Sequence, residues 1–222
     1  MDSSTMVVAD LHLGCEAVLE HEGLSIPRVQ AEHIGRYLVD LLSSVRPARL
    51  VVAGDLKHNF SRNLIEEWDA VSRFVEMLRG HVQLEVVRGN HDNYLGSILR
   101  GFEVPLRQEA ELSGIRVLHG HSGKPVSGPA VLGHVHPSLS VTDGVVTSAK
   151  EHCFLYSRTD EVLVLPALSL VAGGVDVVRQ ESSDRISPVL TEGLSDFTPI
   201  LFSGERVLRF PKVGKMRRLE GV

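Results

Sequence analysis

The sequence is poor in cysteine and in long apolar runs, and each scarcity excludes a class of protein. Two cysteines in 222 residues, Cys15 and Cys153, exclude a disulfide framework and a zinc cluster built on thiolates. No run of about 18 apolar residues occurs, so we expect no membrane span and no membrane partner. The N-terminus lacks the basic flank and cleavage site of a signal peptide, and this predicts a reducing, cytoplasmic location.

Positive charge is not in excess either. The chain has 23 Lys and Arg residues against 28 Asp and Glu residues, which gives a net charge of −5 at pH 7. A protein that coats nucleic acid needs a basic surface, so that class is disfavoured, whereas an enzyme that touches nucleic acid at one metal-lined site is not. Apolar residues make up 43% and charged residues 23%, as in an ordinary folded protein, and the length predicts one domain over residues 1–222.

In the first half of the chain, short apolar runs alternate with segments of helical periodicity. We expect strands at 6–9, 50–53 and 82–87, with helices over 25–45 and 63–78 between them. Strands and helices in alternation are typical of a sheet built by crossover connections. This half therefore predicts an α/β fold.

The second half consists of short apolar runs separated by Gly, Pro, Ser and Asp, with little helical periodicity. These runs predict a second, more antiparallel sheet, with strands at 115–118, 130–132, 144–146, 153–156 and 162–165. The polar, turn-rich segment 173–198 is expected to be a mobile loop. The basic tail from Lys212 to Arg218 is expected to be a solvated end.

Polar clusters follow directly on five of the apolar runs. The clusters are Asp10-Leu11-His12, Gly54-Asp55, Gly89-Asn90-His91-Asp92, His119-Gly120-His121 and Gly133-His134-Val135-His136. Because the carboxyl ends of strands in an α/β protein meet at a common crevice, we expect these side chains to line one pocket. Oxygen and nitrogen donors without thiolate suit Mn²⁺, Fe²⁺ or Zn²⁺. At least seven candidate ligands are too many for one ion, and they indicate two.

Taken singly, each of these residues has a commoner explanation. An Asp after a strand is most often a turn former or a helix cap, and a lone His is usually a surface residue or a satisfied core residue. What favours a metal site is the recurrence of such groups at successive strand ends, which together supply the ligands of two ions.

The ordered set D-x-H, G-D, G-N-H-D, H-G-H and G-H-x-H resembles the calcineurin-like metallophosphoesterase superfamily. The residues in and around these motifs are most similar to those of the archaeal SbcD-related phosphoesterases. The motifs span Asp10 to His136. The fold expected on this resemblance is a four-layer α/β/β/α sandwich of two mixed sheets, with a dinuclear metal site at the strand ends. Strands that are nearly continuous apolar runs agree with such a sandwich, because both faces of each sheet are covered.

The resemblance also implies a set of metal ligands. One ion would be bound by Asp10, His12 and His136, the other by Asn90, His119 and His134, and Asp55 would be shared by both. The ions expected are two divalent cations, Mn²⁺ first, with Fe, Zn, Ni or Mg as alternatives.

Two further residues, His91 and Asp92, receive roles from the resemblance. His91 would protonate the departing alkoxide or stabilise the charge that develops on the phosphoryl oxygens. Asp92 would hydrogen-bond the other nitrogen of His91 and fix its tautomer. His58 and His121 would contact the substrate phosphate or support a ligand from behind, with support the preferred interpretation.

The activity predicted is metal-dependent hydrolysis of phosphodiesters, in a nucleotide or in nucleic acid, by a two-metal mechanism. A phosphomonoesterase or nucleotide phosphatase, a hydrolase of cyclic nucleotides or dinucleotides, a repair-type nuclease and a non-catalytic scaffold remain as alternatives. A nuclease needs basic residues near the pocket, for which the candidates are Lys57, Arg62, Arg88 and Lys124. A scaffold would have lost ligands or the motif His, and here all are present.

Overall fold

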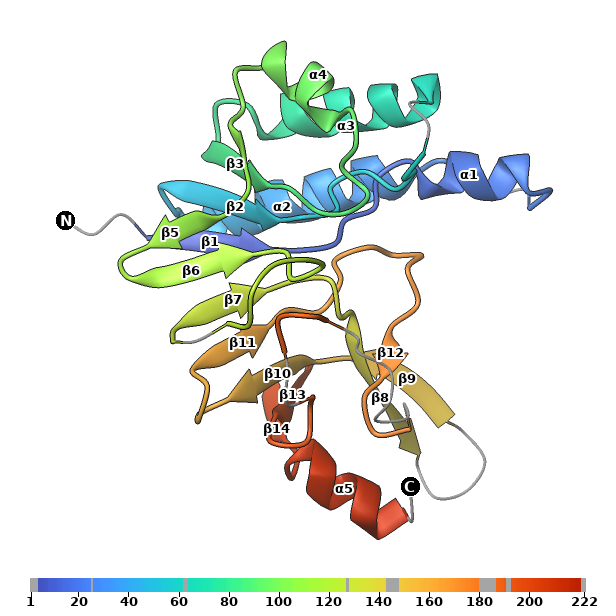
Figure 1. The fold of residues 1–222 in the computed structure, drawn as a ribbon. Helices are drawn as coiled ribbons and strands as arrows, with labels where there is room; N and C mark the ends of the chain where they lie inside the picture. The colour runs from blue at the N-terminus through green and yellow to red at the C-terminus, as the bar shows by residue number, and fades with distance from the viewer. Residues whose placement is uncertain are drawn as a thin grey trace.

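The computed structural model describes residues 4–24, 26–61, 64–126, 128–142, 148–179, 187–190 and 193–220. Its first sheet is parallel at every pairing (Figure 1). In order across the sheet, the strands are β1 (Thr5–Val8), β2 (Arg49–Ala53), β3 (Gln83–Val87) and β4 (Leu106–Arg107). The three strands predicted for the first half are therefore confirmed, with bounds that differ by a residue.

Two long helices connect these strands and cover one face of the sheet. In α2 (Gln30–Val45) and α3 (Ile65–Leu78), apolar residues at helical spacing such as Leu38 and Phe74 are fully buried. They share one core cluster with Leu50, Val52 and Val86 of the strands. None of the helices that the structure describes is long and apolar enough to cross a membrane.

Helix α2 begins at Gln30, five residues later than the sequence predicts. The backbone N–H of Gln30 donates to the buried carboxylate of Glu16, 2.7 Å away, so the first turn of the helix is stabilised by a distant side chain. Two short helices, α1 (Cys15–His21) and α4 (Leu95–Arg100), were not expected. Helices of seven and six residues are too short to show a helical period in the sequence.

The second sheet has seven strands. In order across the sheet they are β14 (Arg206–Arg209), β13 (Thr198–Ser203), β10 (Phe154–Ser157), β11 (Val162–Val164), β7 (Ala130–Leu132), β6 (Ile115–Leu118) and β5 (Ala110–Leu112). Four of its six pairings are antiparallel and two are parallel, which confirms the more antiparallel character predicted for this half. A smaller mixed sheet is formed by β12 (Val175–Asp176), β8 (Pro137–Thr142) and β9 (Ser148–His152). The strand predicted at 144–146 lies outside the described residues.

The first two sheets are joined by an apolar cluster. Ala9, Val51 and Ala53 from the parallel sheet meet Val117 and Leu165 from the second sheet, and all five are buried. The cluster brings the carboxyl ends of strands from both sheets to the same side of the molecule, as Figure 1 shows. An α/β fold with mixed sheets is confirmed, and the four-layer arrangement stays a prediction.

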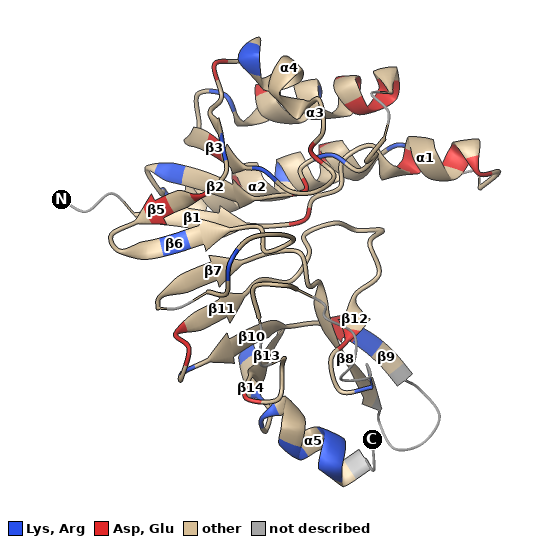
Figure 2. Cartoon of the chain, viewed as in Figure 1, with Lys and Arg blue, Asp and Glu red and all other residues tan. Residues whose placement is uncertain are grey.

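Two segments predicted to be loose are packed where the structure describes them. Within 173–198, β12 pairs with β8, and Val177 and Phe197 are buried in the core of the second sheet. The basic tail forms helix α5 (Val213–Glu220), which carries several Lys and Arg residues (Figure 2). Its Val213 is fully buried, and Arg217 donates to the backbone carbonyl of Val177 at 3.0 Å. Part of 173–198 lies outside the described residues, and the mobility of that segment stays a prediction; in the tail, Lys212, Lys215 and Arg218 are exposed. The packing of the apolar residues was not predicted, because isolated apolar residues among polar ones carry no clear period.

Candidate metal centre

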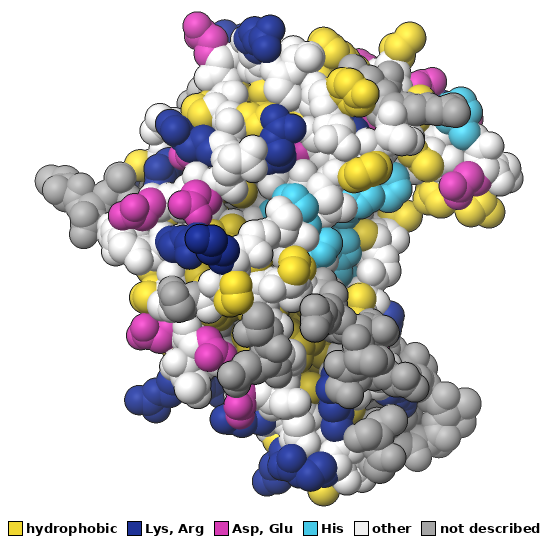
Figure 3. Space-filling view, viewed as in Figure 1, with side chains coloured by type: hydrophobic (Ala, Val, Ile, Leu, Met, Phe, Trp, Pro, Cys, Tyr) yellow, Lys and Arg dark blue, Asp and Glu magenta, His cyan; other side chains and the backbone are white. Residues whose placement is uncertain are grey.

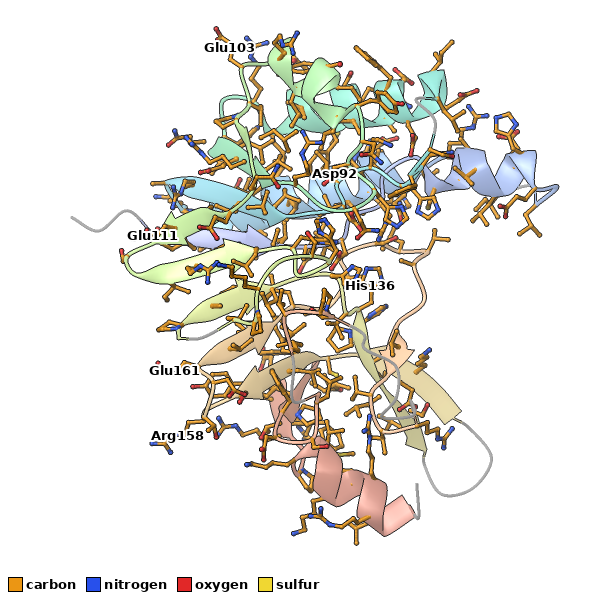
Figure 4. All side chains as sticks on the ribbon, in the orientation of Figure 1. Asp92, Glu103, Glu111, His136, Arg158 and Glu161 are labelled. Atoms are coloured by element: carbon orange, nitrogen blue, oxygen red, sulfur yellow. The ribbon has the colours of Figure 1, made fainter. Side chains whose placement is uncertain are left out.

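The candidate ligands come from loops that follow five strands. Asp10 follows β1, Asp55 follows β2, Asn90 follows β3, His119 follows β6 and His134 follows β7. Figure 4 places Asp92 in the loops beyond the first sheet and His136 in those beyond the second, on the same side of the molecule. Histidine side chains gather in one area of the surface there (Figure 3). The convergence that the sequence predicts is therefore present.

The backbone at these loops is unusual. Five candidate ligands have a positive φ, namely Asp10 (56°), His12 (47°), Asp55 (51°), His134 (69°) and His136 (48°). A left-handed backbone is unfavourable for residues other than glycine, by about 1–3 kcal/mol, and such residues concentrate at functional sites. The chain accepts this unfavourable geometry at the positions that turn Asp and His side chains into the cluster.

Two glycines of the motifs explain why the loops can approach so closely. A Cβ at Gly89 would lie 2.1 Å from Asp55 Oδ1, and a Cβ at Gly54 (φ +90°) would lie 2.3 Å from His119 Nδ1. Neither distance is tolerable for a carbon atom. Each glycine is therefore required so that a candidate ligand can occupy its place.

Asp10, His12 and His136 form the first ligand group. Their donor atoms all lie within 4.8 Å of one another. His136 Nε2 is 3.3 Å from Asp10 Oδ1 and 3.3 Å from His12 Nε2. The Asp10 carboxylate is buried and accepts the backbone N–H of His134 at 2.9 Å, which fixes its orientation. This is the group that the sequence assigns to one ion.

Asp55, His119 and His134 form the second ligand group, again with donors within 4.8 Å of one another. Asp55 Oδ2 is 3.2 Å from His119 Nε2 and 3.9 Å from His12 Nε2. One carboxylate oxygen thus lies between the two groups, as a shared ligand requires. Asn90 Oδ1 is 3.1 Å from His119 Nε2, which places the predicted amide ligand beside the second group.

The protonation of these residues suits a cation. Burial lowers the pKa of His12 to about 3 and that of His134 to about 4, so both imidazoles are neutral at pH 7 with a lone pair available. For Asp55, burial raises the pKa, but the hydrogen bond and the charge of His119 outweigh it and hold that pKa well below its usual range. Neutral imidazoles and ionised carboxylates are the ligand forms that divalent metals bind, so the residues fit two such ions.

His119 is the exception among the imidazoles. Burial lowers its pKa, but the hydrogen bond to Asp55 and the charges of Asp55 and Asp10 outweigh burial and raise it to about 9. Its Nδ1 lies 3.0 Å from the carbonyl oxygen of Ala53. At pH 7 His119 therefore carries a proton on each ring nitrogen when no metal is bound.

His91 borders both ligand groups and is partly exposed. Its Nε2 lies 3.9 Å from Asp55 Oδ2, and its Nδ1 contacts the backbone carbonyl oxygen of His58. A carbonyl oxygen only accepts, so Nδ1 carries a proton and donates it. The His58 side chain, with Nδ1 3.3 Å from His12 Nδ1, joins His12 and His91 as a third group of possible metal donors.

The sequence predicts a hydrogen bond between Asp92 and the imidazole of His91, but in the structure the Asp92 carboxylate binds backbone amides instead. This carboxylate is fully buried and accepts the backbone N–H groups of Gly89 at 2.7 Å, Asp55 at 2.9 Å and Lys57 at 3.3 Å. Buried amides need acceptors, and the Nδ1 of His91 already has one in His58. Burial and then the charge of Asp55 raise the pKa of Asp92 to about 6. Asp92 therefore ties the loop after β2 to the loop after β3.

His121 and the basic residues predicted near the pocket differ in how exposed they are. The ring of His121 lies 5.2 Å from that of His119, and its Nδ1 is buried without a hydrogen-bond partner among the described residues. Of the basic residues predicted to contact phosphate, Arg88 is half-buried, Lys124 is exposed and Arg62 lies outside the described residues. The prediction for Lys57 is wrong, because its side chain is fully buried.

Two buried supporting residues escaped the sequence analysis. Glu67 of α3 accepts the backbone N–H groups of His58, at 2.9 Å, and Asn59, and its Oε2 lies 3.5 Å from Lys57 Nζ. The Gln30 side chain donates to the carbonyl of His12 at 2.9 Å and accepts from Ser169 Oγ at 2.8 Å. The sequence does carry a signal for Glu67, because it lies three and four residues before Ala70 and Val71, on the buried face of α3.

Replacing Glu67 should destabilise the protein. Glu67→Ala leaves the buried Lys57 ammonium without its carboxylate and two backbone amides without an acceptor, so the free energy of unfolding should fall by about 3 kcal/mol or more. Urea denaturation followed by circular dichroism measures this. Glu66→Ala is the control, because Glu66 is 32% exposed and lies 4.0 Å from Arg28; it should change the stability by less than about 1 kcal/mol. Equal losses in the two variants would contradict the buried ion pair.

Metal binding should release a proton at neutral pH. Because the pKa of His119 is about 9 in the metal-free protein, an ion that takes its nitrogen at pH 7 must displace a proton. Titration calorimetry with Mn²⁺ in two buffers of different ionisation enthalpy should show about one proton released. The apparent affinity should rise as the pH increases from 7 towards 9 and then level off. A constant affinity over this range would show that His119 is not deprotonated on binding.

Comparison with known proteins agrees with this geometry. The model of the calcineurin-like phosphoesterase family matches residues 3–174. A search of curated proteins gave no match. Among solved structures, the nuclease MPE of Pseudomonas putida is similar with a TM-score of 0.65 and 20% identity, over 93% of this chain and 87% of that chain. The phosphoesterase Yfce of E. coli matches with a TM-score of 0.41 and 19% identity, over 91% of this chain and 90% of that chain.

These comparisons differ in what they support. The first solved structure, at 20% identity, supports the fold alone, and the second carries no argument at its TM-score. The closer resemblance to archaeal SbcD-related phosphoesterases stays a prediction. The family model covers well over half of the chain, including all the candidate ligands, and the chain therefore belongs to the calcineurin-like phosphoesterase family.

Proposed function

We propose that the protein hydrolyses phosphodiester bonds, in nucleotides or in nucleic acid, with two divalent metal ions of which Mn²⁺ is the first candidate. Family membership supports the coarser statement that it is a hydrolase of phosphate esters. The observation that carries the proposal is the position of Asp55 Oδ2, which lies between two groups of oxygen and nitrogen donors. A shared carboxylate suits the two-ion arrangement that stabilises both the attacking and the leaving oxygen of a phosphoryl displacement.

Seven residues are assigned to the metals in this proposal. They are Asp10, His12 and His136 for one ion, Asn90, His119 and His134 for the other, and Asp55 for both. When bound, the ions would supply positive charge to the phosphoryl oxygens and lower the pKa of an attacking water.

His91 is assigned the transfer of a proton. Its Nδ1–H donates to the His58 carbonyl, so Nε2 is the nitrogen directed at the cluster. When Nε2 is protonated, it can give that proton to the alkoxide that leaves as the ester bond breaks. Partial exposure of the ring leaves it open to a substrate. His58 acts here through its carbonyl, and His121 is assigned support of the second ligand group beside His119.

We further propose that residues 1–222 form one domain that contains this site. Its fold would be the four-layer α/β/β/α sandwich expected from the resemblance to archaeal SbcD-related phosphoesterases. The buried cluster between the two larger sheets and the helices on the outer face of the first sheet support this arrangement. A cytoplasmic location is kept as part of the proposal.

The proposal predicts metal-dependent hydrolysis of a simple phosphodiester. Bis(p-nitrophenyl) phosphate should be hydrolysed in Mn²⁺ and not after treatment with EDTA, and activity should return when Mn²⁺ is added back. The release of nitrophenol measures the rate. A protein that binds two ions and hydrolyses p-nitrophenyl phosphate but no diester would instead be a monoesterase. A protein that binds two ions and hydrolyses neither would favour the scaffold alternative.

His91 should be needed for turnover and not for metal binding. In His91→Ala, kcat for the dinucleotide dTpdT should fall by about 10²–10⁴-fold, because the leaving alkoxide loses its proton donor, whereas hydrolysis of bis(p-nitrophenyl) phosphate should fall much less, since nitrophenolate leaves without a proton. The metal content, measured by elemental analysis after dialysis, should be unchanged. His33→Ala removes an exposed histidine of α2 and should leave both quantities unchanged. Loss of an ion from His91→Ala would assign His91 to the ligands together with His12 and His58.

A further inference from the structure

Phe60 is a large apolar side chain that the fold keeps in water beside the metal centre. It is 57% exposed, and its ring lies edge-on to that of His91, with the ring centroids 6.2 Å apart and the planes at 80°. Phe74 and Phe197, by contrast, are fully buried in the cores. An aromatic ring exposed next to a proposed catalytic group can stack on part of a substrate that enters the site.

The loop that carries Phe60 is held on both sides. Asn93 Nδ2, two residues beyond His91, donates to the carbonyl of Phe60 at 2.9 Å. The next residue, Ser61, donates its backbone N–H to Asn59 Oδ1 at 3.0 Å, and Glu67 holds the N–H of His58. The turn that carries the Phe60 ring is therefore hydrogen-bonded to the loop that carries His91. A fixed aromatic surface loses little entropy when a ligand covers it.

The charges around the site favour recognition of an aromatic group. The chain has a net charge of −5, and Lys57, the basic residue next to His58 in sequence, is buried against Glu67. Long-range attraction of a phosphate backbone is weak in such a chain. Stacking of a base on an aromatic ring is a short-range contact that needs no charge and accepts any base. In a nucleotide only the sugar separates the base from the phosphate. A phosphate at the metal centre would therefore place its base near a ring that lies beside His91.

We propose that Phe60 determines substrate specificity by stacking on a nucleobase linked through its sugar to the scissile phosphodiester. This inference rests on the proposed function and narrows it to substrates that carry a base next to the reacting phosphate. The base can belong to a short nucleotide ester or to a single strand of nucleic acid. Phe60 takes no part in metal binding or proton transfer.

Kinetics with matched substrates test the stacking. Phe60→Ala should lower kcat/KM for the dinucleotide dTpdT, for a single-stranded oligonucleotide, or for both, by about 10-fold or more. Phe60→Tyr, which keeps the ring, should stay near the wild type. Phe202→Ala is the control, because Phe202 is 58% exposed on β13 of the second sheet, and it should change neither rate. A defect confined to the dinucleotide or to the oligonucleotide would identify the source of the base.

A base-free substrate and a binding measurement separate this inference from the proposed function. Phe60→Ala should hydrolyse a dinucleotide analogue with abasic sugars as fast as the wild type, with the same metal content and melting temperature. In calorimetry, its Kd for dTMP should rise about 10-fold, while its Kd for inorganic phosphate stays unchanged. Equal dTMP affinities in the two proteins would overturn the stacking even if diesters are hydrolysed. Absence of all diester hydrolysis would overturn the proposed function, and dTMP binding would still decide the role of Phe60.

Discussion

The carboxylate of Asp55 is the group around which the candidate metal centre is arranged. It is almost fully buried, yet it accepts the backbone N–H of His91 at 2.9 Å through Oδ1 and lies 3.2 Å from His119 Nε2 through Oδ2. A buried carboxylate without such partners would be neutralised by protonation. Because its neighbours keep it ionised, Asp55 holds a negative charge between two groups of imidazoles. That charge raises the pKa of His119, so in the metal-free protein a proton on His119 partly balances the carboxylates.

An arrangement of this kind needs support from outside the ligand groups. The left-handed backbone at five candidate ligands, Asp10, His12, Asp55, His134 and His136, is unfavourable, and loops with such residues relax unless neighbouring groups hold them. Three buried polar side chains provide this: Asp92, Glu67 and Gln30 each bind backbone groups of the ligand-bearing loops. Each comes from a different part of the chain. The loops of the first sheet are thus fixed by side-chain hydrogen bonds and not by packing alone.

The sequence was informative where function depends on local order along the chain. The strands before Asp10, Asp55 and Asn90 were predictable because a continuous apolar run ends at each polar cluster. That the clusters would meet was expected from the strand ends, and the structure brings their side chains together. The partners of buried polar groups were not predictable. The helical period places Glu67 on the buried face of α3, but its bonds to the His58 amide and to Lys57 depend on tertiary packing.

The dependence of hydrogen-bond partners on tertiary structure also explains why the expectation for Asp92 was wrong. A carboxylate next to His91 in sequence was the natural partner for that imidazole, but the buried amides of Gly89 and Asp55 compete for it, and amides without an acceptor in the interior are costly. The imidazole then takes the carbonyl of His58 instead. Which acceptor a buried donor finds is a property of the folded loops, and a motif alone does not contain it.

The charge of the molecule sets how a phosphate ester can be recognised. The chain is acidic overall, and several of its Lys and Arg residues are in α5, β14 and β9 (Figure 2). Lys57, in the G-D-L-K-H segment, forms a buried ion pair with Glu67 and is not available to a substrate. Under the proposed function, an anionic substrate would be attracted at short range, by cations at the ligand groups and by uncharged contacts beside them. A site of this kind discriminates by what is attached to the phosphate, because the phosphate itself is bound by parts that every ester shares.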